Sequence, residues 1–139
     1  MKRLLIIASV ALASVGFASH TAPKPYRVAF DLTSRDTLDQ KAVLRWVNEV
    51  VTNDPAAQVE VVMYGKGFEL VMPERSPFAE KVRDALQNPR VTFAVCAIAL
   101  KSNQVQTSQL VPGVQVVPDG LHELVMKQQD DWGYIKVGH

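Results

Sequence analysis

Strand-like and helix-like segments alternate along the chain from residue 26 to its end. The third strand-like run is nearly continuously apolar, as a strand covered on both faces requires. A chain that crosses over between successive strands favours parallel pairing, with helices on both faces of the sheet. The alternation therefore predicts one α/β domain, residues 26–139, with a mostly parallel sheet. Its expected strands are residues 26–32, 58–64, 91–97, 114–117 and 134–137.

Apolar periodicity and end signals predict the first helix. In residues 38–52 the apolar side chains fall on one broad stripe, and the charged side chains lie opposite. Asp36 or Thr37 can cap its start, and Pro55 ends it because proline cannot continue a helix. The helix is therefore expected to pack its apolar stripe on the sheet.

Shorter helices are expected in the second half of the chain. Ser76 is expected to cap one, with Pro77 in its first position. Residues 97–103 are predicted to form a short helix, and Thr107 is expected to cap a further turn. The last helix is predicted over residues 121–129, with an inward face made of Leu121, Leu124 and Val125.

The N-terminus has the pattern of an export signal. Lys2 and Arg3 precede an uncharged run over residues 4–17, which is short against the ~20 residues of a membrane-spanning helix. Cleavage is expected after Ala18, leaving a tether over residues 19–25; an uncleaved N-terminal anchor is the alternative. The segment 1–18 predicts a periplasmic or otherwise exported protein with no membrane span after cleavage.

Charge argues against one class of partner. The chain has 15 basic and 14 acidic residues, and without Lys2 and Arg3 the 13 remaining basic residues give a formal net charge of −1. No cluster of Lys and Arg stands out, whereas binding to a phosphate backbone needs one. Nucleic acid is therefore not an expected partner.

Cys96 is the single cysteine and the strongest candidate for chemistry. In an exported protein a lone cysteine is a buried spectator, half of an intermolecular disulfide, or a reactive thiol. It is expected at the carboxyl end of a central strand, where open parallel sheets have their ligand crevices, and just before a helix whose dipole favours a thiolate. Lys101 adds positive charge if it folds back. A small buried side chain in the core explains the pattern equally well.

Other polar residues are expected at the same edge of the sheet. Asp31, Thr33 and Ser34 end the first strand and can line a crevice shared with Cys96, although helix capping explains them nearly as well. Gly65 begins a Gly-Lys-Gly turn after the second strand, which hints at a backbone anion site. A plain strand–helix turn is the better interpretation, because the turn lacks the known phosphate-binding patterns.

The histidines give no metal site. His20, His122 and His139 are scattered, and none has a zinc-ligand spacing with Cys96. His122 is expected on the solvent side of the last helix. No metal or other cofactor is predicted.

Residues 91–136 resemble the DsrE/DsrF-like family, in its branch of small single-domain members. Residues 59–67 and 76–79 also look like the family, so the resemblance covers nearly all of the chain after the tether. The motifs that carry it are Leu100-Lys101-Ser102, Leu110-Val111-Pro112-Gly113-Val114, Val116-Val117-Pro118, Gly120, Glu123-Leu124-Val125 and Gly133-Tyr134-Ile135.

The resemblance implies a three-layer α/β/α fold on a five-stranded parallel sheet, assembled as a homo-oligomer, a trimer or a hexamer. In several relatives a cysteine carries persulfide sulfur between partner proteins, and Cys96 matches its position. Many members of this branch have Asn-Thr or Asn-Ser soon after the cysteine, where this chain has Ile98-Ala99. The surroundings of Cys96 are therefore more apolar here. The known sulfur relays are cytoplasmic, so their partners do not carry over to an exported chain.

Two hypotheses follow from the sequence. In the first, Cys96 reversibly holds sulfur, so that the protein is a carrier between a sulfur donor and an acceptor protein more than a turnover enzyme. In the second, the protein is a non-catalytic, oligomeric binding module whose cysteine only packs the core. The accessibility of the thiol distinguishes the two.

Overall fold

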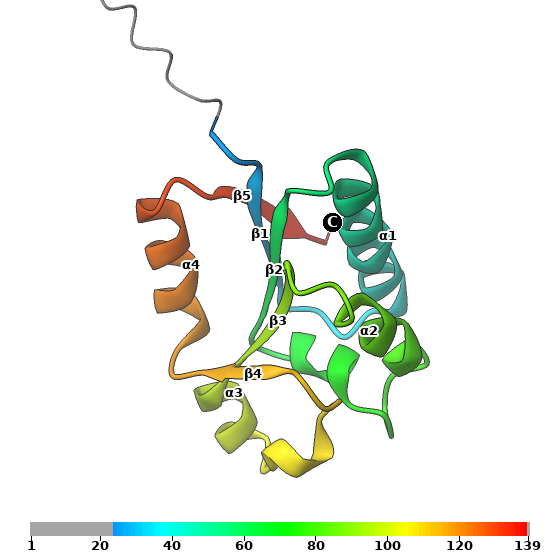
Figure 1. The fold of residues 1–139 in the computed structure, drawn as a ribbon. Helices are drawn as coiled ribbons and strands as arrows, with labels where there is room; N and C mark the ends of the chain where they lie inside the picture. Colours follow the sequence, from blue (N-terminus) through cyan, green and yellow to red (C-terminus); the bar gives the residue numbers. More distant parts are fainter. Residues whose placement is uncertain (1–23, 139) are drawn as a thin grey trace, which may run out of the picture.

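The five strands form one parallel sheet in the order β4-β3-β2-β1-β5. The structure is a computed structural model that describes residues 24–138, and Figure 1 shows its strands and helices. Every strand pair is parallel, which confirms the predicted sheet. The predicted signal segment and most of the tether lie outside the described residues. The strands are β1 (Arg27–Leu32), β2 (Gln58–Met63), β3 (Val91–Cys96), β4 (Gln115–Val117) and β5 (Gly133–Val137).

Helices cover both faces of the sheet, as predicted (Figure 1). Helices α1 (Thr37–Asn53) and α2 (Ala79–Ala85) cover one face, and α4 (Gly120–Gln129) covers the other. The short helix α3 (Ala97–Ser102) follows β3 directly at the carboxyl edge of the sheet. Two 3-10 turns, η1 (Gly67–Val71) and η2 (Thr107–Gln109), complete the connections. Among residues 24–138, no helix has the length and apolar character needed to cross a membrane.

Capping explains where the long helices begin. Asp36 caps α1, because its Oδ1 accepts a hydrogen bond from the backbone N–H of Leu38 at 2.7 Å. Asp119 does the same for α4 through Leu121 at 2.9 Å. The helix predicted to start at Pro77 begins later, at Ala79. Ser76 Oγ accepts from the N–H of Phe78, so that Ser76 closes a turn ahead of the helix and is not its cap.

A second capping prediction was wrong by one residue. Thr107 is the first residue of η2, and the preceding Gln106 is its cap. The backbone N–H of Gln106 donates to Oε1 of Gln109 at 2.9 Å. The side chain of Gln106 in turn accepts from the backbone of Gln109, so this pair replaces the expected threonine cap.

The hydrophobic core lies mainly between the sheet and α1 and α2. Phe30, Val61 and Phe93 point to this side and are completely or almost completely buried. Trp46 of α1 packs on Phe30 with its ring centroid 6.0 Å away. Three neighbouring strands thus contribute paired apolar side chains to one face of the sheet, because side chains point alternately to its two faces along each strand.

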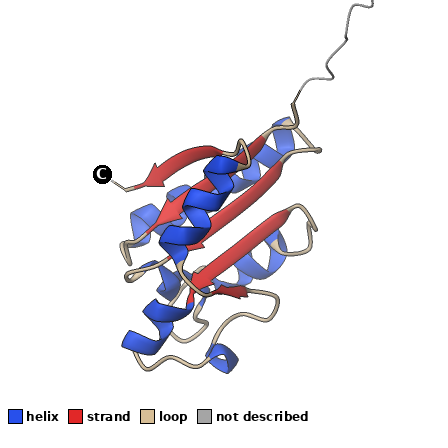
Figure 2. Cartoon of the chain, turned by 90° about the vertical axis from the view of Figure 1, so that its left-hand side faces the viewer, coloured by secondary structure: helices blue, strands red, loops and turns tan. Residues whose placement is uncertain are grey.

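The core on the α4 side is much smaller, and the predicted inward face of the last helix is confirmed for Leu124 but wrong for Leu121 and Val125. Only Leu124 is buried, against Ala29 and Val62, while Leu121 is 57% and Val125 is 49% exposed. Seen from its own side, α4 runs across the sheet with strand visible to either side of it (Figure 2). One helix on small side chains buries one row of its residues and leaves the flanking rows in solvent.

Candidate functional site

Cys96 lies where three elements meet. It is the last residue of β3 and the N-cap of α3, and its side chain is buried, with 4% of the residue exposed. A Cβ placed on Gly120, the first residue of α4, would lie only 3.3 Å from the Cβ of Cys96. Glycine therefore lets the start of α4 approach the cysteine closely. The predicted position of Cys96, at the carboxyl end of a central strand and before a helix, is confirmed.

Tyr64 lies beside Cys96 at the same edge. Met63 of β2 pairs with Val95 of β3, so the next residues, Tyr64 and Cys96, are level with each other and on the same side of the sheet. The Cβ of Tyr64 is also 3.3 Å from the position that a Cβ on Gly120 would take. Cys96, Tyr64 and Gly120 thus form one contact region on the α4 side.

Asp31 connects this region to the far edge of the sheet. It is 2% exposed, and its Oδ2 accepts hydrogen bonds from Tyr134 Oη at 2.6 Å and Tyr64 Oη at 3.3 Å. Lys136 Nζ approaches the same oxygen at 3.7 Å. The other oxygen, Oδ1, is buried without a hydrogen-bond partner among the described residues. A buried carboxylate thus has three donors around one oxygen and a free acceptor on the other.

The Asp31 carboxylate contributes to the raised pKa of both phenols. Its hydrogen bond with Tyr134, helped by burial and by its negative charge, raises the pKa of Tyr134 to about 12. Burial, together with the charge and hydrogen bond of Asp31, raises the pKa of Tyr64. Both phenols therefore stay protonated at neutral pH, so both can donate to the carboxylate.

The other predicted crevice residues mainly shape the neighbouring turns. Ser34 Oγ accepts from the backbone N–H of Asp36 at 2.9 Å, which closes a turn just ahead of α1, whose cap is Asp36. The Thr33 carbonyl accepts from the N–H of Lys66 at 3.0 Å, and a Cβ on Gly65 would lie 3.1 Å from that carbonyl oxygen. Gly65 also has φ +58°, a conformation that favours glycine. The loops after β1 and β2 thus meet, but through backbone contacts.

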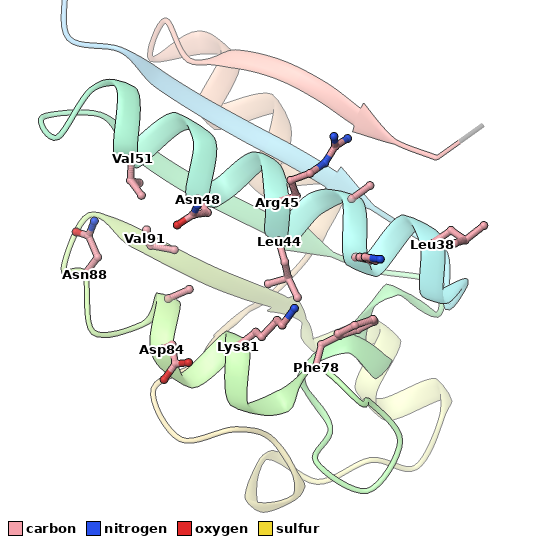
Figure 3. A pocket seen from close by; sticks show the side chains of 13 residues that line it. Leu38, Leu44, Arg45, Asn48, Val51, Phe78, Lys81, Asp84, Asn88 and Val91 are labelled. Atoms are coloured by element: carbon pink, nitrogen blue, oxygen red, sulfur yellow. The ribbon is translucent and has the colours of Figure 1, made fainter.

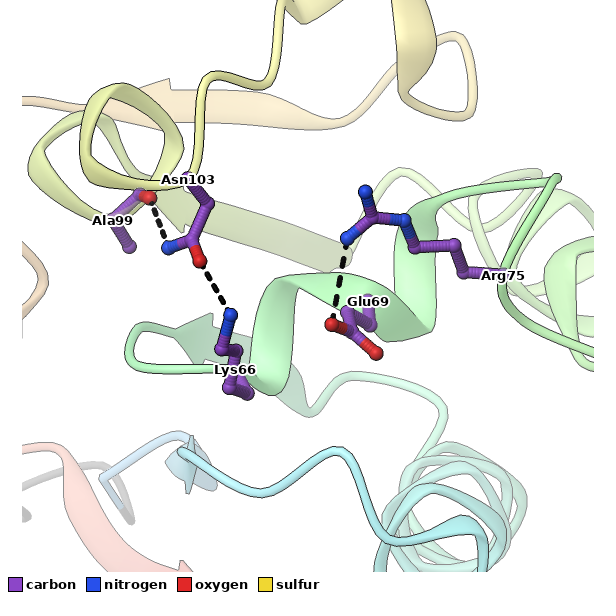
Figure 4. Close-up of polar contacts among 5 residues, drawn as sticks. All are labelled: Lys66, Glu69, Arg75, Ala99 and Asn103. Atoms are coloured by element: carbon purple, nitrogen blue, oxygen red, sulfur yellow. Dashed lines mark hydrogen bonds and ion pairs between the residues drawn. The ribbon is translucent and has the colours of Figure 1, made fainter.

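The Gly-Lys-Gly turn has a structural partner. Lys66 Nζ donates to Asn103 Oδ1, and Asn103 Nδ2 donates to the Ala99 carbonyl at 2.7 Å (Figure 4). This chain of contacts joins the turn to α3. In a second, separate ion pair, Arg75 Nη1 lies 3.5 Å from Glu69 Oε1. Lys66 is therefore occupied in the fold, which favours a plain turn over an anion site.

Lys101 and His122, the histidine among residues 24–138, both have exposed side chains. Lys101 is exposed at the end of α3, and no hydrogen bond or ion pair between described side chains joins it to Cys96. His122 is exposed on α4, as expected. Over residues 24–138, no group of three or more His, Cys, Asp or Glu side chains is placed to hold a metal ion.

Sequence reasoning missed Tyr64, Tyr134 and Lys136 as members of this site. The sequence contained a signal for Tyr64, because Tyr64 is the last residue of the predicted strand 58–64 and Cys96 is next to last in the predicted strand 91–97. For Tyr134 and Lys136 the signal was absent, because only the pairing of β5 with β1 brings them to Asp31.

Comparison with known proteins agrees with this architecture. The model of the DsrE/DsrF-like family matches residues 27–137. The solved structure of a protein of unknown function, MTH1491 from Methanobacterium thermoautotrophicum, superposes with a TM-score of 0.75 at 25% identity, covering 80% of this chain and 98% of that one. The ychN protein from E. coli gives a TM-score of 0.67 at 12% identity, covering 81% and 99%. No curated protein that was compared matches this chain.

Proposed function

This chain belongs to the DsrE/DsrF-like family, a family generally related to sulfur transfer, and we propose that it is an exported sulfur carrier in which Cys96 holds the sulfur. The observation that carries the proposal is the place of its only cysteine, at the carboxyl edge of the central sheet where α3 and α4 both begin. Ligand crevices of open parallel sheets form at this edge.

The transfer step is an exchange between a thiol and a persulfide. The Cys96 thiolate attacks the outer sulfur of a donor persulfide, a bond forms between Sγ and that sulfur, and the sulfur–sulfur bond of the donor breaks. The donor leaves as a thiolate and takes up the proton that Cys96 lost. The products are a Cys96 persulfide and a donor thiol, so no external oxidant or reductant is needed.

The Asp31 group would position the surroundings of the thiol. Its hydrogen bond holds the ring of Tyr64, which contacts the same glycine as Cys96. Because Cys96 is buried in the single chain, transfer requires that the contacts of Tyr64 or of the start of α4 open when a partner binds. Sulfur donor and acceptor proteins are the expected partners.

We also propose that the protein forms a homo-oligomer through the α4 side. Leu121, Val125, Met126 and Tyr134 are all at least 40% exposed there, and burying such apolar surface is the main driving force of stable assembly. Light scattering of the purified protein tests this. A protein that is monomeric at all concentrations would contradict the proposal. A Leu121→Asn variant whose oligomer has the same mass as that of the unchanged protein would also contradict it.

Export is proposed from the charged start and apolar run of residues 1–18. N-terminal sequencing of the protein recovered from the cell envelope should find Ser19 as the first residue. Recovery of a full-length chain from the cytoplasm would contradict export.

Mass spectrometry tests the carrier function directly. The mature protein is mixed with glutathione persulfide, and Cys96 is expected to gain one sulfur atom that a thiol reductant removes. Cys96→Ala is the matched control and should gain none. Native protein whose thiol reacts with iodoacetamide but gains no sulfur would rule out the carrier.

A second candidate, an oligomeric binding module with a structural cysteine, is favoured by the burial of Cys96. It predicts that iodoacetamide labels Cys96 only after unfolding. It also predicts that Cys96→Ala leaves the activity in vivo unchanged. Labelling of the native protein within minutes would contradict this candidate.

A further inference from the structure

A long groove runs between α1 and α2, on the side of the sheet opposite α4. Its volume is about 860 Å³, and Figure 3 shows the side chains that line it. Leu44 and Val91 line its bottom but are buried, with 9% and 4% of each residue exposed, whereas Phe78 is half-buried. Leu38, at the end of the groove, is 68% exposed although it belongs to the apolar stripe of α1. The accessible apolar surface of the groove therefore includes Leu38 and part of Phe78.

The sides of the groove are positively charged. Lys41 and Arg45 lie one turn apart on α1, and Lys81 lies across from them on α2; Asp84 is the single acidic residue that lines the groove. None of the three basic side chains forms an ion pair with a described residue. Lys81 Nζ lies 5.8 Å from the centre of the Phe78 ring, and the Arg45 side chain extends away from α2 (Figure 3).

We propose that this groove binds an acidic amphipathic helix of a partner protein. Along α1 the groove runs from Leu38 to Val51, which is about 20 Å at the helical rise of 1.5 Å per residue. A helix of similar length would lay its apolar side along the groove, against Leu38 and Phe78, as in other helix-in-groove complexes. Acidic residues on its two flanks would meet Lys41 on one side and Lys81 on the other.

Charge argues against a second copy of this chain as the occupant. Among the described helices, α4 has the most exposed large apolar side chains, but its Lys127 forms ion pairs with Glu123 and Glu60. Its sequence has one acidic and one basic residue, so it does not complement a basic groove. The proposal does not depend on sulfur transfer, because the groove and Cys96 belong to opposite sides of the sheet.

The test uses two synthetic amphipathic peptides of about 14 residues, a length that matches the groove. Both carry leucines on one face; one has glutamates on both flanks, and the other has lysines. Fluorescence anisotropy with the mature protein should show binding of the glutamate peptide alone, weakening as salt rises because the charges are exposed. Lys41→Glu and Lys81→Glu should each lower the affinity by roughly threefold to tenfold.

Matched variants separate the groove from general charge. Arg35→Glu makes the same charge change at an exposed residue outside the groove and should leave the affinity unchanged. Leu38→Ser should weaken binding without affecting folding, because Leu38 is mostly exposed. Equal binding of both peptides, no binding, or equal effects of Lys81→Glu and Arg35→Glu would overturn the proposal. It would also be overturned by binding to anionic vesicles but not to the peptide, or by a dimer that Leu38→Ser dissociates.

Discussion

The two faces of the sheet differ in what they bury. Toward α1 and α2 the strands present Phe30, Val61 and Phe93, which pack in one large apolar core. Toward α4 the same strands present Asp31 and Glu60, both nearly inaccessible to solvent. Burying a carboxylate is unfavourable unless it has partners, whereas burying an aromatic ring stabilises the fold. One face thus supplies stability, and the other holds groups that can do chemistry.

Glu60 shows how the α4 face compensates for its charges. Lys127 Nζ lies 2.6 Å from Glu60 Oε2 and 3.4 Å from Glu123 Oε1. Lys127 also lies 4.5 Å from the centre of the Trp132 ring. Burial raises the pKa of Glu60, and the hydrogen bond and charge of Lys127 oppose that shift. The α4 face is therefore stabilised at this position by the ion pair of Glu60 and Lys127, whereas the opposite face is stabilised by apolar packing.

The largest expected effect is on the apolar face. Phe93→Ala removes a fully buried ring and should lower the free energy of unfolding by about 3–5 kcal/mol. Because the loss comes from a cavity, it should be the same at pH 5 and pH 7. Urea unfolding at both values measures it. A loss below about 1 kcal/mol would mean that the site collapses on mutation and that this face is not the rigid core.

A somewhat smaller and pH-dependent effect is expected on the α4 face. Lys127→Met leaves the Glu60 carboxylate without its cation and should destabilise the protein by about 2–3 kcal/mol at pH 7. The pKa of Glu60 is already raised in the folded state and rises further when Lys127 is removed. Stability is then highest below pH 4.5, where the carboxyl is neutral in both states, and is lost as pH rises through the folded-state pKa.

The same urea titrations therefore distinguish the two faces. Lys127→Met should regain stability between pH 7 and pH 5, unlike Phe93→Ala. The double variant Glu60→Gln with Lys127→Met is the control, because it removes the buried charge and should abolish the pH dependence. A single Lys127→Met variant with equal losses at both pH values would show that Glu60 does not need its cation.

Much of the fold could be predicted because its determinants are local. The end of α1 follows from Pro55, its start follows from Asp36, and the buried β3 follows from a continuous apolar run. The position of Cys96 follows from its place between a strand and a helix. Such features depend on neighbouring residues only, so a single sequence contains them.

The rest depends on long-range arrangement. The amphipathic pattern predicts that Leu121 and Val125 lie on the apolar side of their helix, but it does not predict whether other residues of the same chain bury them. The convergence of Tyr134 on Asp31 requires that β5 pair with β1, at the edge opposite β4. The apolar pattern of each strand does not predict the order of the strands in the sheet, so this part of the site is seen only in the three-dimensional structure.

The smallest expected effect on stability, at Tyr134, tests the polar face most directly. The pKa of Tyr134 is raised to about 12 chiefly by its hydrogen bond to Asp31, so Asp31→Asn should bring it back toward the ordinary value of 10. Phenolate absorbance after rapid pH jumps measures this, in a Tyr26→Phe and Tyr64→Phe background where only Tyr134 titrates. Asp130→Asn, an exposed carboxylate, is the control and should not move the midpoint.

The sign of the stability change follows from the raised pKa. The bond between Tyr134 and Asp31 stabilises the fold fully below pH 10 and is lost as pH rises toward about 12. The effect should be small, because Tyr134 is partly exposed and solvent weakens the interaction. If Asp31→Asn leaves the Tyr134 midpoint unchanged, the carboxylate does not control the phenols. The α4 face would then lack the hydrogen bond that joins Tyr134 of β5 to Asp31 of β1.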